Sequence, residues 1–147
     1  MKTPDKVKLF LVDDDALYLK LLEIDLLQQA DFVIETYATG ELCLEKLSHN
    51  PDIIILDYFL DSVEKNAMNG LEVLDKIKAI NQDIPVIMLS SQDKIEVAIN
   101  CMHHLAFDYV VKSETAFIRL LKTITFICKL KKMEKTVNWY MGMMEQL

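Results

Sequence analysis

The chain reads LFLVDDD at residues 9–15 and IIILD at residues 53–57. In both stretches an uninterrupted aliphatic run ends directly in aspartate, the pattern of a buried parallel strand followed by a polar loop. The carboxyl ends of parallel strands meet at one edge of an open α/β sheet, and such sheets bind ligands there. If the two strands are neighbours, the carboxylates of Asp13, Asp14 and Asp57 converge. Because like charges repel unless a cation joins them, the sequence predicts a site for a hard divalent metal.

The composition is that of an ordinary globular domain, with 147 residues of which 52% are hydrophobic and 27% are charged. A net charge of −7 argues against direct nucleic-acid binding. No apolar run approaches the roughly 20 residues of a membrane span, and the N-terminus lacks signal-peptide character. The cysteines are widely spaced and predict free thiols: Cys43, Cys101 and Cys128. We therefore expect a cytoplasmic protein that does not bind membranes.

Strand-like and helix-like segments alternate along the chain. The strand-like runs are residues 8–12, 32–37, 53–56, 85–89 and 109–111, and the segments with helical spacing are 16–30, 40–48, 71–80, 93–104 and 115–130. In the first helix the predicted apolar stripe contains Leu19, Leu22, Leu26 and Ala30, broadened by Leu17, Leu21 and Ile24. Five β-α units predict a doubly wound, five-stranded parallel sheet with helices on both faces, a flavodoxin-like (βα)5 fold.

Two segments break this alternation. Residues 61–69 form a long loop after the third strand, and residues 132–147 form a tail that is too short for a second domain. We expect the tail either to prolong the last helix or to remain separate from the domain of residues 7–131. Its large side chains predict an apolar contact surface: Trp139, Tyr140, Met141, Met143 and Met144.

Further polar residues fall at the edge of the sheet that carries the acids. Ser90 follows the fourth strand-like run and Lys112 follows the fifth. A carboxylate can act as a nucleophile and form an acyl phosphate. A hydroxyl and an ammonium group can bind the oxygens of an arriving phosphoryl group, which is stabilised largely by positioned charge. The set therefore predicts phosphoryl chemistry assisted by a metal.

With these residues in place, the chain resembles the receiver domain of two-component response regulators from about residue 8 to residue 130. Five motifs carry the resemblance in order: VDD at 12–14, ILD at 55–57, NGLE at 69–72, PVIMLS at 85–90 and DYVVK at 108–112. One such motif alone would be weak, but five at successive strand ends are specific.

The resemblance implies a role for each residue of the site. Asp57 is the expected phosphoacceptor, and Asp13, Asp14, Asp57 and the backbone carbonyl of Phe59 are the expected ligands of Mg²⁺. Ser90 is the hydroxyl that moves toward the phosphoryl group, Lys112 is its counter-ion, and Tyr109 is the switch aromatic. The implied donor is a histidine kinase or a phosphotransfer protein. The implied output is a changed protein-binding face formed by residues 93–104, 109–111 and 115–130, in a switch that does not turn over as an enzyme.

Other interpretations stay open at this point. Asp13 and Asp14 could merely cap the first helix, as Asp15 is expected to do, and Tyr109 could be a core residue. The whole domain could be a degenerate receiver that binds proteins without being phosphorylated, and the tail could support a homodimer. An aspartyl phosphatase of the haloacid dehalogenase type would need an Asp-x-Asp-Gly/Thr sequence, which residues 13–17 lack.

The chain departs from the family pattern in three places. The loop after Asp57 is longer than usual, with Asp61 and Glu64 expected to be solvated rather than near the metal. Ser113 stands where the family usually has a proline in a cis peptide bond, so the conformation after Lys112 is left open. Ser91 replaces a smaller residue and narrows the approach of phosphate.

Overall fold

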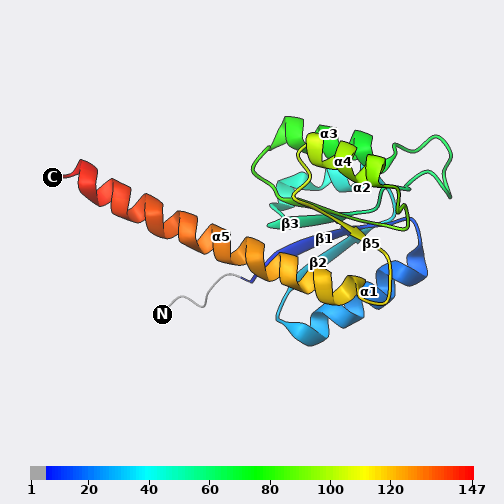
Figure 1. The fold of residues 1–147 in the computed structure, drawn as a ribbon, viewed down its shortest axis with the longest axis horizontal. Coiled ribbons are helices and arrows are strands. Elements are labelled where there is room, and N and C mark those ends of the chain that lie inside the picture. Colours follow the sequence, from blue (N-terminus) through cyan, green and yellow to red (C-terminus); the bar gives the residue numbers. More distant parts are fainter. Residues whose placement is uncertain (1–5) are drawn as a thin grey trace.

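A parallel sheet forms the centre of the molecule, of which the computed structural model describes residues 6–147. The strands lie in the order β2-β1-β3-β4-β5, with bounds β1 (Lys8–Val12), β2 (Val33–Tyr37), β3 (Ile53–Leu56), β4 (Val86–Ser90) and β5 (Asp108–Val111). One face of the sheet is covered by α1 (Ala16–Gln29) and α5 (Ala116–Glu145) (Figure 1). The other is covered by α2 (Gly40–Glu45), α3 (Gly70–Ile80) and α4 (Ile95–His103). The predicted doubly wound fold is confirmed.

Alternating side chains of the strands enter the two apolar layers. On β1, Leu9 and Leu11 pack with residues of α1 and α5, whereas Phe10 and Val12 pack with residues of α2 and α3. Both sides of β1 and β3 are buried, which explains why their sequences are continuously apolar rather than alternating. The chain leaves β1 toward one side of the sheet and leaves β3 toward the other. The carboxyl ends of β1 and β3 are therefore the topological switch point of the sheet.

The apolar stripe of α1 is narrower than its sequence predicts. Leu19, Leu22 and Leu26 are buried, as expected. The prediction for Ala30 is wrong, because the helix ends at Gln29 and Ala30 is exposed. The prediction that three further side chains broaden the stripe is wrong, because these lie at 43–71% exposure: Leu17, Leu21 and Ile24. A helix that lies on one face of a sheet is covered along one side only, and the remainder of its surface faces water.

Several element boundaries also differ from the sequence prediction. The segment 40–48 contains the short helix α2 and then a 3₁₀ turn at Leu47–His49, which Asn50 ends in the left-handed conformation with φ 57°. Ser90 is the last residue of β4 rather than the first residue after it. The last helix continues without a break to Glu145, so the tail prolongs it. No helix among residues 6–147 combines the length and apolarity needed to cross a membrane.

Candidate phosphoacceptor site

Three carboxylates meet at the switch point of the sheet. Val12 and Leu56 are paired in register, so the residues that follow them, Asp13 and Asp57, leave neighbouring strands at the same level. Asp13 and Asp57 are 5% and 4% exposed, whereas Asp14 is half-buried. One carboxylate oxygen from each of the three lies within 4.8 Å of the others. Such an all-oxygen, acidic donor set fits a hard divalent cation such as Mg²⁺.

Lys112 brings a positive charge to the same cluster. Its Nζ donates to Asp13 Oδ2 at 2.8 Å and to Asp57 Oδ2 at 3.4 Å. The ammonium also lies 4.2 Å from the ring centre of Tyr18, a cation–π contact that residue order alone does not predict. Burial alone would lower the pKa of Lys112, but the contacts with Asp13 and Asp57 outweigh burial and the pKa is raised. Lys112 therefore stays charged between the two carboxylates.

The surroundings of Asp57 disfavour the charged form of its carboxylate. Burial, followed by repulsion from Asp13, raises its pKa from 3.8 to about 7, although Lys112 acts in the opposite direction. One lysine therefore does not balance two buried acids. A bound divalent cation would supply the missing charge, and this is a second reason why the residues fit Mg²⁺.

Asp14 contacts the long loop that follows β3. Its Oδ2 accepts hydrogen bonds from the backbone N–H groups of Ser62 at 3.0 Å and Val63 at 3.3 Å. Asp61 and Glu64 of the same loop are exposed, in agreement with their predicted solvation. Residue types alone do not predict these contacts, because every residue except proline carries the same backbone N–H group.

Of the other predicted site residues, Asp15 caps α1 as expected, since its side chain accepts from Tyr18 N. The backbone N–H of Phe59 donates to Asp57 Oδ1 at 3.3 Å, and the expected role of the Phe59 carbonyl as a ligand stays a prediction. No cis peptide bond occurs within residues 6–147, so Lys112 and Ser113 are joined in trans.

The loop after β4 connects two further predicted residues through a single backbone unit. Ser90 is fully buried, and its Oγ accepts from the N–H of Gln92 at 3.2 Å. The hydroxyl of Tyr109 donates to the carbonyl of Gln92 at 2.7 Å. Tyr109 is only 7% exposed, and burial above all raises its pKa to about 12. A movement of Ser90 would therefore change the position of Gln92 and, through it, the hydrogen bond of Tyr109.

The start of α3 is fitted closely against the backbone of Asp57. Gly70 donates its N–H to the carbonyl of Tyr58 at 2.8 Å, and a Cβ at this position would lie 2.3 Å from the Asp57 carbonyl oxygen. We expect Gly70→Ala to lower the free energy of unfolding by about 1–3 kcal/mol, because backbone cannot yield as a flexible side chain does. Urea unfolding measures the change. Gly142→Ala is the control, since a Cβ at position 142 would meet no atom within 4 Å apart from its chain neighbours and the adjacent helix backbone. Equal stability loss in both variants would contradict the prediction.

Comparison with known proteins agrees with this geometry. Residues 9–125 match the family model of the response regulator receiver domain. The chain is 36% identical over 118 residues to a protein-glutamate methylesterase/protein-glutamine glutaminase of Clostridium acetobutylicum, covering 77% of this chain and 32% of that protein. It is 32% identical over 124 residues to the two-component response regulator ORR27 of Oryza sativa, covering 84% of this chain and 18% of that protein. The chain thus spans about a third or less of these relatives.

Solved structures show the same fold. The signal receiver domain of a putative Luxo repressor protein from Vibrio parahaemolyticus superposes with a TM-score of 0.78 and 24% identity, over 90% of this chain and 98% of that one. Because the family model covers most of the chain, and the buried acids, the lysine and the β4 serine occupy the strand ends expected of the family, this protein belongs to the response regulator receiver domains.

Proposed function

We propose that this domain is a Mg²⁺-dependent phosphoacceptor switch in which Asp57 receives a phosphoryl group from a phosphohistidine. The observation that carries the proposal is the convergence of Asp13, Asp14 and Asp57 with the ammonium of Lys112 in one largely buried cluster. The donor would be a histidine kinase or a phosphotransfer protein, in keeping with the family. The unpaired Cys43, Cys101 and Cys128 fit a reducing cytoplasm.

In the proposed reaction, a carboxylate oxygen of Asp57 attacks the phosphorus as the bond from phosphorus to the donor's imidazole nitrogen breaks. The imidazole leaves with the bonding electron pair and takes up a proton, and Asp57 becomes an acyl phosphate. Bound Mg²⁺ would offset the negative charge shared by the acids and the phosphoryl oxygens. Lys112 is already placed between Asp13 and Asp57, so it can bind a phosphoryl oxygen with little rearrangement.

The proposed output begins at Ser90. If its hydroxyl turns toward the phosphoryl group, its hydrogen bond with Gln92 N is lost and the loop between β4 and α4 shifts. The carbonyl of Gln92 then no longer holds the Tyr109 hydroxyl in its buried position. This sequence would change the face formed by α4, β5 and α5, where we place the downstream protein partner. The domain acts as a switch in this proposal, with no substrate turned over.

Intact-mass measurement after incubation with Mg²⁺ and acetyl phosphate tests the proposal. We expect wild type to gain one base-labile phosphoryl group of about 80 Da. Asp57→Asn and a wild-type sample containing EDTA should gain none. A wild-type protein that binds Mg²⁺ in calorimetry but gains no phosphoryl group would contradict the proposal and favour a receiver that acts as a phosphorylation-independent scaffold.

A further inference from the structure

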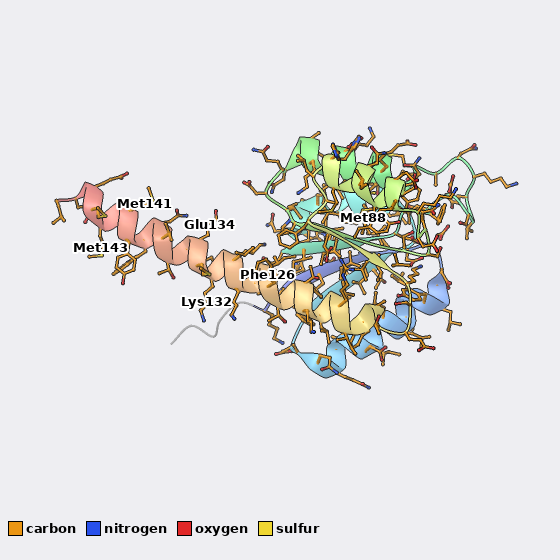
Figure 2. The ribbon with its side chains drawn as sticks, viewed as in Figure 1. Met88, Phe126, Lys132, Glu134, Met141 and Met143 are labelled. Atoms are coloured by element: carbon orange, nitrogen blue, oxygen red, sulfur yellow. The ribbon has the colours of Figure 1, made fainter. Side chains whose placement is uncertain are left out.

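The second half of α5 leaves the domain and projects into solvent as a single helix (Figures 1 and 2). The first half is anchored in the core by Ala116, Leu120, Ile124 and Ile127. Every residue from 132 to 147 is exposed, and half of them are large hydrophobic residues: Met133, Val137, Trp139, Tyr140, Met141, Met143, Met144 and Leu147. A helical segment of this length is marginal in water on its own, and most helices are stabilised by burying an apolar face.

The exposed apolar residues of α5 follow a heptad repeat. Spacings of four and three residues alternate without interruption through Phe126, Leu130, Met133, Val137, Tyr140 and Met144, and Leu147 continues the series. The six residues within the helix are 39–71% exposed. Side chains with this mean spacing of 3.5 residues form one straight seam when two helices wind around each other. We call these seven residues the α5 seam.

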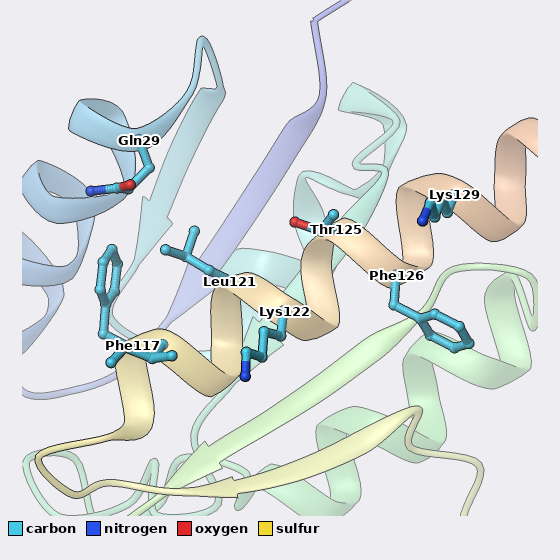
Figure 3. A pocket seen from close by; sticks show the side chains of 8 residues that line it. Gln29, Phe117, Leu121, Lys122, Thr125, Phe126 and Lys129 are labelled. Carbon is cyan, nitrogen blue, oxygen red and sulfur yellow. The ribbon is translucent and has the colours of Figure 1, made fainter.

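The seam is distinct from the side of α5 that packs against α1. Phe117 and Leu121 point toward Gln29 at the end of α1, whereas Phe126 points away from α1 (Figure 3). The ring of Phe126 lies 6.2 Å from that of Phe107, which precedes β5. Next to it, Leu130 shares a hollow with Leu105, itself 61% exposed. The apolar surface of the seam therefore continues onto the domain.

Charges beside the seam indicate which partner fits it and in which direction. If Leu130 and Val137 are taken as a positions and Met133 as a d position, Lys129 is a g position and Glu134 is the e position of the next heptad. In a parallel pair of identical helices these two positions face each other across the interface, so Lys129 of each chain would meet Glu134 of the other, twice by symmetry. An antiparallel pair would instead bring g to g and e to e, so Lys129 and Glu134 would not meet and this attraction would be absent. Both residues are exposed.

We propose that the α5 seam is a parallel, two-stranded coiled-coil interface with a second copy of this chain. Each chain contributes the same surface to the interface, so the assembly stops at two chains, as in other symmetric dimers. The dimer covers the apolar surface that a single chain exposes to water. Met141 and Met143 flank the distal heptad and widen the apolar contact there. The two domains lie side by side at one end of the coiled coil. Dimerisation through the seam requires neither Asp57 nor Mg²⁺, so it stands independently of the proposed phosphoacceptor function.

Sedimentation equilibrium of the full chain, from micromolar to near-millimolar concentration, tests the interface. We expect twice the mass of one chain for wild type and for Asp57→Asn. Val137→Asp, which buries two carboxylates at the seam, should weaken the dimer by about 100-fold or more. Asn138→Asp adds the same charge to the neighbouring residue outside the seam and should leave the dimer intact; the helix propensities of the residues involved are similar. A monomer or a trimer for wild type, or equal masses for the two variants, would overturn the proposal.

A charge-exchange series tests the parallel direction. Lys129→Glu and Glu134→Lys each place like charges opposite one another and should weaken the dimer, whereas the double variant restores opposite charges and should recover it. Lys129 and Glu134 lie five residues apart and do not face each other within one helix, so recovery reports on contact between chains. If the loss of dimerisation free energy in the double variant equals the sum of the losses in the two single variants, the parallel arrangement is overturned.

Discussion

Lys112→Met is expected to slow phosphorylation by acetyl phosphate in saturating Mg²⁺ by about 10²–10³-fold. The substitution keeps most of the volume of the side chain and removes the ammonium that contacts Asp13 and Asp57. The phosphoryl oxygens lose a positioned positive charge, and this loss sets the expected size of the effect. A time course of intact mass measures the rate.

Two control variants separate charge from geometry in this experiment. Lys76→Met removes an exposed lysine on α3 and should phosphorylate at the wild-type rate. Lys112→Arg keeps the charge on a planar group of different shape and should fall between wild type and Lys112→Met. An unchanged rate in a folded Lys112→Met protein would contradict the role proposed for the lysine.

Asp57→Asn is expected to raise the free energy of unfolding of the metal-free protein by about 2–4 kcal/mol at pH 8, since each pKa unit corresponds to about 1.4 kcal/mol. In the folded state burial and Asp13 raise the pKa of Asp57 from 3.8 to about 7. Between these values the folded state binds more protons than the unfolded state, so wild-type stability falls as the pH rises through this window. The variant lacks this loss, so the stability difference between the two proteins should be small near pH 4, widen as the pH rises toward 7, and level off above pH 7.

Urea unfolding in EDTA at several pH values measures this difference. Asp61→Asn neutralises an exposed carboxylate of the 61–69 loop and should show no comparable gain at pH 8. Saturating Mg²⁺ should narrow the gap between wild type and Asp57→Asn, because the cation supplies the charge that the metal-free cluster lacks. An Asp57→Asn protein that is less stable than wild type at pH 8 would show that the buried acid is already balanced.

The fold was predictable because its strands carry local signals. Residues 9–12 and 53–56 are apolar without interruption because both faces of β1 and β3 are covered. Such runs can be recognised in the sequence without the structure. The positions of Asp13, Asp57 and Lys112 followed from the same signals, because the ends of parallel strands meet at one edge. Helix faces were less predictable: Leu17 and Leu21 are chemically indistinguishable from the buried Leu19 and Leu22, and only packing decides which of them is covered.

Sequence by itself thus determined the doubly wound sheet, the meeting of three acids and a lysine at its edge, and the heptad spacing from Phe126 onward, since each is written in residue type and order. Tertiary structure alone decided the contacts between Asp14 and the backbone of Ser62 and Val63, and the position of Tyr18 over Lys112. It also decided that the core of the domain takes Ile124 and Ile127 while Phe126 and Leu130 stay in water. These contacts join residues far apart in the chain or involve backbone groups. Neither kind of contact produces a repeating pattern of residue types from which it could be predicted.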